Sequence, residues 1–396
     1  MSKSKVKLFG LSLAASLMFS VTSSSLYAAP APVEPEGLFF ATTEEISKNV
    51  ARSNIALEKS SSNLPNLNDY SSFAYDVKEV ENNPELRSFL QKALQDGKKV
   101  YLYGGLTPGK YEELLNQPLE FKVSNEAEGE VRSLVINDVQ QNEGELKSGL
   151  KETTEQEIVG YTLEDQNYKL FMLNYQNMDE NGNEIPTDAS IILNQIVNHE
   201  ERANQITPFS TIVKSNTADI RTVGGLYGQD NAEMTTQWLL YKEKNESDTK
   251  FDYFAIKDII RIKKLGGSTD AKKLTVTHDV MYSKDDLYDA APGDTSTGPY
   301  EVIFTYPWEL QWTFTYDGNP NIDLTENTST DTAKWVITSD FLQNLQSTDN
   351  FQLGTSWKAA SAYPYTGLQV SHVTEWHSAV QHMFDLSNTF NVGYNW

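Results

Sequence analysis

The sequence has no cysteine and only five histidines among its 396 residues. The absence of cysteine excludes disulfides, thiolate nucleophiles and cysteine-bound metal centres. The histidine spacing disfavours zinc, because His372, His377 and His382 follow at steps of five, whereas zinc-binding helices place histidines at i and i+4. We therefore predict no zinc site from this spacing, and we interpret His278 as a hydrogen-bonded core residue.

Basic residues are also scarce, since 32 Lys and Arg stand against 55 Asp and Glu, for a formal net charge of −23. A field of this sign repels phosphate backbones, so nucleic acid is not expected as a partner. Two common catalytic templates, the G-x-S-x-G elbow and H-E-x-x-H, do not occur. We expect a non-enzymatic protein with no organic cofactor, and Ca²⁺ is the ion to consider.

A long apolar run occurs only near the start of the chain. Lys3, Lys5 and Lys7 precede an apolar stretch over residues 8–21, which a small and polar segment follows. The stretch is shorter than the about 20 residues of a membrane span, so the pattern predicts a secretory signal peptide over residues 1–28. We expect a secreted (extracellular) bacterial protein with no constitutive membrane span.

Composition divides the remaining chain into three segments. Residues 29–65 predict a Pro-rich tether and an amphipathic helix over 43–57. Residues 66–200 predict an α+β domain. Residues 201–396 contain all seven tryptophans and many short alternating segments, which favours an antiparallel sandwich. The predicted fold class is an α+β N-terminal unit followed by an all-β antiparallel sandwich.

Local patterns place individual elements along these segments. We expect helices at residues 84–94 and 111–115. We expect strands at residues 99–103, 159–163, 168–175, 190–197, 235–242, 251–262, 274–282, 334–338, 369–373 and 390–395. Two acidic segments, residues 283–299 and 317–332, are interpreted as long loops.

Residues 104–110 match the phosphate-binding pattern G-x-x-x-x-G-K. Tyr111 stands where a hydroxyl must hold magnesium, and Pro108 removes a backbone N–H from the phosphate cradle. The structural interpretation is that Thr107 caps a helix whose first residue is Pro108. We therefore do not predict nucleotide binding.

Two segments have the oxygen spacing of calcium sites. Residues 177–182, with Asp188 beyond, resemble an EF-hand loop, but Asn181-Gly182 is also a strong hairpin signal, and we favour a hairpin without metal. The second segment alternates oxygen-bearing side chains and is a candidate Ca²⁺ site, although turn chemistry accounts for the same residues. Its predicted ligands are Asp317, Asn319, Asn321 and Asp323.

Residues 301–316, EVIFTYPWELQWTFTY, place large apolar side chains at every even position. This period of two indicates β structure with one face of rings. Pro307 cannot donate a ladder hydrogen bond, so we predict two collinear strands bent at that residue.

Three functional hypotheses remain open. The first is a secreted recognition protein that binds glycans or a cell surface through Trp308, Trp312 and Trp376. The second is a secreted pore-forming or membrane-acting, toxin-like protein. The third is a two-carboxylate or metal-assisted hydrolase, with Glu309 and Glu375 as its acids.

Overall fold

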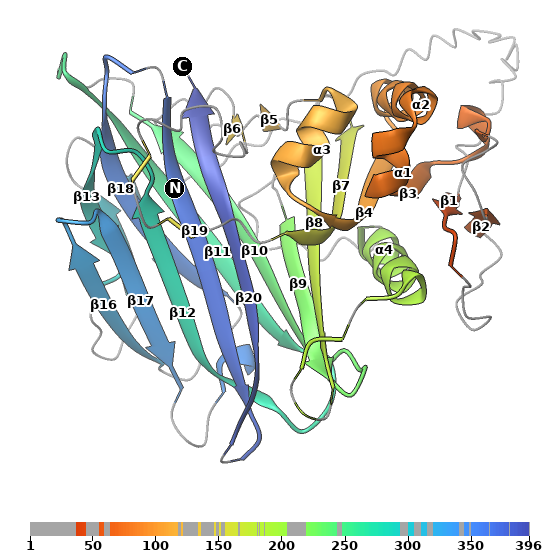
Figure 1. Cartoon of the computed structure of the whole chain (residues 1–396). Helices are drawn as coiled ribbons and strands as arrows, with labels where there is room; N and C mark the ends of the chain where they lie inside the picture. The colour runs from red at the N-terminus through yellow and green to blue at the C-terminus, as the bar shows by residue number, and fades with distance from the viewer. Residues whose placement is uncertain are drawn as a thin grey trace, which may run out of the picture. The chain divides into compact units, whose positions relative to one another are not determined.

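Two large β-sheets dominate the described part of the chain, which is mostly β with few helices (Figure 1). All described residues belong to the unit Pro35–Trp396. The computed structural model describes residues 37–44, 55–58, 64–117, 120–121, 134–135, 146–147, 150–151, 155–164, 167–179, 181, 183–185, 187–203, 219–243, 248–293, 300–304, 310–314, 320–339, 344–347, 350–363, 365–379 and 381–395. The predicted signal peptide lies outside them.

The larger sheet has eleven described strands in the order β13-β18-β11-β10-β9-β8-β7-β4-β3-β1-β2. In that order the strands are Asp285–Ala291, Phe351–Ala360, Phe251–Lys264, Ala232–Lys242, Asp219–Leu226, Asn167–Met178, Gln156–Glu164, Lys99–Leu106, Ser72–Asp76, Leu38–Ala41 and Ile55–Glu58. Parallel pairing joins β1 to β2, β1 to β3, β3 to β4 and β8 to β9. The last pair crosses the predicted boundary at residue 200, so strands from both sides of it share this sheet.

The second sheet has seven described strands, all antiparallel, in the order β16-β17-β12-β19-β20-β6-β5. In that order the strands are Asn321–Asn327, Thr332–Thr338, Asp270–Val280, Tyr365–His377, His382–Asn395, Leu134–Val135 and Glu120–Phe121. A separate two-stranded sheet consists of β14 (Tyr300–Phe304) and β15 (Leu310–Phe314).

The described α-helices are α1 (Val77–Asn82), α2 (Pro84–Gln95), α3 (Pro108–Leu115) and α4 (Ala189–Ala203), and 3-10 turns lie at Leu67–Asp69 and Leu345–Ser347. Three of the four described α-helices sit in crossovers between parallel strands, α1 and α2 between β3 and β4 and α4 between β8 and β9, whereas α3 follows β4. The predictions of α2, α3 and strand β4 are confirmed. Thr107 accepts a hydrogen bond from the Lys110 N–H and Pro108 is the first residue of α3, as the cap interpretation predicts.

Helix α4 corrects the strand predicted at residues 190–197. Ile192, Leu193, Ile196 and Val197 are buried, and their spacing fits one face of a helix rather than alternation. The Asp188 carboxylate accepts a hydrogen bond from the Ile191 N–H and so caps the helix. The prediction was wrong because a short run of apolar residues does not by itself separate the two periods.

Three further predictions fail for a related reason. The last residues of the helix predicted over 43–57 belong instead to strand β2, which pairs with β1. The two predicted acidic loops contain strands β13 and β16, which pair with β18 and β17. Each of these two strands has buried apolar positions, such as Leu287 in β13 and Ile322 in β16, and Asp285 of β13 is itself buried, so acidic composition concealed both strands.

One core cluster joins the facing surfaces of the two large sheets. It contains Ile256 of β11, Val276 of β12 and Val370 of β19. Trp238, Trp335, Trp357 and Trp376 are buried, in keeping with the large area that these rings remove from water. None of the described helices has the length and apolar character needed to cross a bilayer.

Candidate functional site

Strands β14 and β15 pair with each other as an antiparallel hairpin and form a separate two-stranded sheet. The prediction of two collinear strands bent at Pro307 is therefore wrong, because the chain reverses between them. Residues 305–309, Pro307 and Trp308 included, lie outside the described residues. A proline cannot donate to a ladder, which favours a break in strand pairing at this point.

The register of the hairpin preserves the alternation seen in the sequence. Tyr300 pairs with Phe314, Val302 with Trp312, and Phe304 with Leu310. Directly paired residues share a face of a two-stranded sheet, so these three pairs occupy one face. The opposite face holds the pairs Glu301–Thr313 and Ile303–Gln311. In this register the pairs of even-numbered positions hold only aromatic and aliphatic residue types, and the pairs between them hold mostly polar residue types.

The hairpin lies beside one edge of the larger sheet. Strand β14 follows β13 in the chain and runs near β13 and β18, the last two strands at that edge. It hydrogen-bonds to neither large sheet as a strand.

Trp376, the third predicted ligand-binding residue, is fully buried in β19. Its ring stacks on Phe384 with centroids 5.9 Å apart, and its Nε1 donates to Thr374 Oγ1 at 3.2 Å. The Trp376 ring is a core element here and offers no surface for stacking on a ligand. Among the three predicted tryptophans, Trp312 is the one whose backbone the structure places in the hairpin.

The predicted calcium ligands are only partly described. Asn321 and Asp323 lie exposed on β16, and Asn321 Nδ2 donates to Asp323 Oδ2 at 3.3 Å. Asp317 and Asn319 lie outside the described residues. In this arrangement an amide nitrogen, and not an oxygen, faces the carboxylate of Asp323. Calcium binding at these four residues stays a prediction.

The EF-hand-like segment forms hydrogen bonds that need no ion. Asp179 accepts hydrogen bonds from the backbone N–H groups of Asn181 and Asn183, at 2.8 and 2.9 Å. The Asn183 side chain also donates to this carboxylate, and these bonds lower the pKa of Asp179. Met178 bridges Glu184 in antiparallel fashion, as expected of a turn. Asp188 is occupied as the cap of α4.

Of the two acids in the hydrolase hypothesis, only Glu375 lies in the described residues. Glu375 forms an ion pair with Lys273 at 2.7 Å. Burial raises the pKa of Glu375, but Lys273 outweighs this effect and lowers the pKa overall. A carboxylate of lowered pKa suits a surface ion pair better than a general acid. Glu309 lies outside the described residues.

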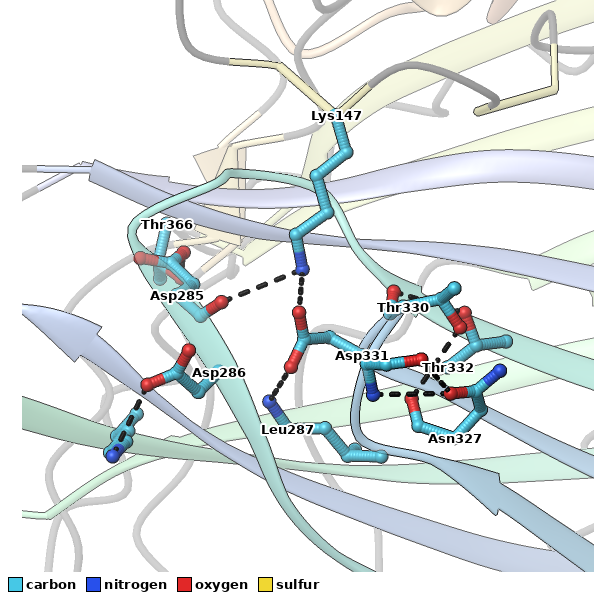
Figure 2. A network of polar contacts seen from close by, with 11 residues as sticks. Lys147, Asp285, Asp286, Leu287, Asn327, Thr330, Asp331, Thr332 and Thr366 are labelled. Atoms are coloured by element: carbon cyan, nitrogen blue, oxygen red, sulfur yellow. Dashed lines mark hydrogen bonds and ion pairs between the residues drawn. The ribbon is translucent and has the colours of Figure 1, made fainter.

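A cluster of polar contacts connects the segment that contains Lys147 to the edge of the second sheet (Figure 2). Lys147 donates from its backbone N–H to Met281 O, and its Nζ forms an ion pair with Asp331. The other oxygen of Asp331 accepts from the Leu287 N–H at 3.0 Å. Asp331 has a φ of 54°, and its own carbonyl accepts from the Val280 N–H. This residue therefore joins Lys147 to the ends of β12 and β13.

Asp285 is the buried acid of this cluster, at 2% exposure. Its Oδ2 accepts a hydrogen bond from Thr366 Oγ1 at 2.6 Å, and Trp357 Nε1 donates to the same hydroxyl at 2.7 Å. Burial raises the pKa of Asp285 to about 7, against the lowering effects of Thr366 and Lys147. This carboxyl therefore titrates near neutral pH.

Sequence reasoning missed a buried charged residue in β11. Phe254, Ile256, Asp258, Ile260 and Ile262 occupy the inward positions of this strand and are all buried. An Asp within an otherwise apolar face is the signal that could have identified it, because an isolated charge is rarely buried without partners. Its partners come from the facing sheet and are described below.

Comparisons with known proteins identify no family. No family model and no curated protein matches the sequence. Among solved structures, a "Pore forming protein" matches with 9% identity and a TM-score of 0.30, over 46% of this chain and 91% of that chain. Clostridium perfringens delta-toxin matches with 11% identity and a TM-score of 0.23, over 42% of this chain and 89% of that chain.

A third match is the Clostridium perfringens NetB toxin in its membrane-inserted form. It has 7% identity and a TM-score of 0.23, over 46% of this chain and 95% of that chain. At TM-scores this low, the matches establish neither a shared fold nor a shared activity.

Proposed function

We propose that this chain is a secreted, non-enzymatic binding protein that attaches to the lipid surface of a cell through the β14–β15 hairpin. The observation that carries the proposal is the register of the hairpin, which places three pairs of large apolar residues on one face. In the proposal, residues 66–200 supply the α+β part of the chain and residues 201–396 supply most of the β-sandwich that displays the hairpin, with one sheet shared between them.

The composition of this face suits a membrane interface. Tyr300 and Trp312 have rings with a polar atom at one end, and such rings favour the boundary between headgroups and acyl chains. Val302, Phe304, Leu310 and Phe314 supply purely apolar area. Burying one Trp or Phe ring contributes about 2 to 3 kcal/mol, or roughly 30- to 150-fold in a dissociation constant.

The charge of the chain sets the lipid preference. With a net charge of −23, the protein is repelled by anionic headgroups, whose surface potential is also negative. Attachment must then rest on apolar burial. We expect binding to zwitterionic vesicles that weakens as phosphatidylserine is added, and salt should relieve that weakening.

Co-flotation of the purified chain with phosphatidylcholine vesicles tests the proposal. Phe304→Ser and Trp312→Ser each remove a residue of the apolar face, and each should weaken binding by roughly 30-fold or more. Ile303→Ser is the matched control, because it removes an apolar side chain from the opposite face and should change binding little.

Equal losses in all three variants would mean that the hairpin acts only as a structural element. Failure to bind vesicles, together with binding to cells that enzymatic deglycosylation abolishes, would contradict the proposal. That second result would favour the glycan-recognition hypothesis.

A further inference from the structure

Asp258, His278 and His372 form a cluster that is fully buried between the two large sheets. Asp258 comes from β11 of the eleven-stranded sheet, whereas His278 and His372 come from β12 and β19 of the seven-stranded sheet. Asp258 Oδ2 lies 3.2 Å from His278 Nε2 and 2.7 Å from His372 Nε2. Two imidazoles and a carboxylate thus converge on one point.

The outer nitrogens of both imidazoles contact oxygen atoms. His278 Nδ1 lies 2.7 Å from Thr355 Oγ1, and His372 Nδ1 lies 2.8 Å from Asn388 Oδ1. Histidines that bind metals commonly use their second nitrogen in this way, since a hydrogen bond there orients the ring and selects the tautomer. Both imidazoles therefore have the kind of second-nitrogen contact that orients histidine ligands in metal sites.

The contact with Asn388 determines the state of His372. Asn388 Nδ2 donates to Thr222 Oγ1 at 3.1 Å, so its Oδ1 faces His372 Nδ1 as an acceptor. Thr236 Oγ1 also lies 3.2 Å from His372 Nδ1, and with Asn388 in this orientation the Nδ1 atom carries the hydrogen. In the neutral imidazole this leaves a lone pair on Nε2, directed at a carboxylate oxygen 2.7 Å away. A positive centre, which is either a second proton or a metal ion, must lie between them.

A second oxygen of the cluster is unsatisfied. Asp258 Oδ1 is buried, and no described group hydrogen-bonds to it. Leaving a buried carboxylate oxygen without a partner costs about 1 to 3 kcal/mol or more. A proton between Asp258 Oδ2 and His372 does nothing for this atom. A cation bound by both carboxylate oxygens would satisfy it.

We propose that Asp258, His278 and His372 bind a divalent transition ion of the zinc class, which joins the two sheets. Two imidazole nitrogens and both oxygens of Asp258 supply four donors, a set that zinc accepts. Donors from different residues that bond one zinc at about 2.0 to 2.2 Å lie about 3.3 Å apart. The His278–Asp258 distance of 3.2 Å fits, and the His372 contact must open by several tenths of an ångström.

This set differs from the one that histidine spacing suggests. His377 contacts Glu375 at 3.5 Å, and His382 contacts Asp385 at 2.7 Å. Both pairs are at the sheet surface and lie apart from the buried cluster. The neighbours of His372 are remote in sequence, so no i and i+4 pattern marks the site.

Metal analysis of the purified chain, after dialysis against Zn²⁺ and then against buffer, tests the proposal. We expect one retained zinc ion per chain, and a melting temperature that falls by about 5 °C or more when a strong chelator removes it. His278→Gln and His372→Gln should each abolish retention. The double variant His377→Gln with His382→Gln is the control and should retain the ion.

The unaltered chain provides a second measurement if the buried variants do not fold. Loading with Co²⁺ should give the visible absorption of a four-coordinate nitrogen and oxygen site, and Zn²⁺ should displace it. Absence of retained metal in the unaltered chain would overturn the proposal and assign the positive centre to a proton. Loss of the metal in the surface double variant alone would assign it to adventitious binding and would also overturn the proposal.

Discussion

Asp258 Oδ2 and His372 Nε2 lie 2.7 Å apart, although 114 positions separate the two residues and they belong to different sheets. Both side chains are fully buried. Burial alone raises the pKa of Asp258, but in the metal-free chain the charge of His372 and the hydrogen bonds from both imidazoles outweigh it and lower the pKa to about 2. The contact therefore joins the two sheets through a carboxylate that is ionised at neutral pH.

Replacing Asp258 by Asn should destabilise the chain in metal-free buffer. The amide removes the charge that the two imidazoles share and directs N–H groups at them, so we expect a loss of about 2 to 4 kcal/mol. Urea unfolding measures this loss. Asp385→Asn is the matched control, because Asp385 also lies 2.7 Å from a histidine, but at an exposed position. Equal losses of unfolding free energy in Asp258→Asn and Asp385→Asn would contradict the expectation that burial makes the Asp258 contact the stronger one.

Replacing Lys147 by Met should loosen the segment that Lys147 holds. Its ion pair with Asp331 is only 18% and 13% exposed, so removal of the ammonium leaves a largely buried carboxylate unpaired. We expect a loss of about 1 to 3 kcal/mol and faster proteolysis near residues 146–151. Lys110→Met removes a more exposed ion pair and should cost less than about 0.5 kcal/mol. Unchanged proteolysis would show that other contacts hold the segment.

Asp285 should make the stability depend on pH near neutrality. Its pKa of about 7 is above that of an unfolded Asp, so the folded state binds the proton more tightly. The stabilisation is complete below about pH 4 and is lost as pH rises through 7. Asp285→Asn should remove this dependence, worth roughly 2 to 4 kcal/mol between pH 5 and 8.

Thermal unfolding of the Asp285→Asn variant across that range checks the prediction. Asp286→Asn, at the exposed neighbouring position, should keep the dependence of the unaltered chain. The opposite slope, with the unaltered chain gaining stability from this group as pH rises, would contradict the raised pKa.

Calcium should stabilise the chain if Asp317, Asn319, Asn321 and Asp323 coordinate it. At a free concentration 100 times the dissociation constant, bound calcium contributes about 2.7 kcal/mol. Calorimetry with Ca²⁺ and with a chelator measures this, and Asp323→Ala should abolish the difference. An unchanged melting temperature would leave these residues as a turn and the start of β16, in which Asn321 donates to Asp323.

Elements with strong local signals could be predicted from the sequence. Helix α2 begins with Pro84 after the Asn83 cap, and α3 begins with Pro108 after Thr107. Proline at the first helical position after a capping side chain depends only on neighbouring residues. The long strands β10, β11 and β12 were largely located from their apolar and β-branched residues, whereas β19 was predicted only over residues 369–373 of its full range.

The candidate sites depend on contacts that sequence order does not contain. The alternating residues on either side of Pro307 predict two strands. They do not show whether β15 continues in the direction of β14 or turns back and pairs with it, as it does in the structure. Trp376 and Trp312 look alike in sequence, yet Trp376 stacks on Phe384 in the core. The Asp258 cluster requires the pairing of two sheets before its three members can be recognised together.

The proposed lipid contact of the hairpin can be tested directly because the chain has no cysteine, so a single introduced cysteine can be labelled. A polarity-sensitive fluorophore can be attached to Val302→Cys or to the neighbouring control Glu301→Cys, which lie on opposite faces. Addition of phosphatidylcholine vesicles should shift the emission at residue 302 to the blue and leave residue 301 nearly unchanged. Equal shifts at both residues, or no shift at residue 302, would contradict attachment through the apolar face of the hairpin.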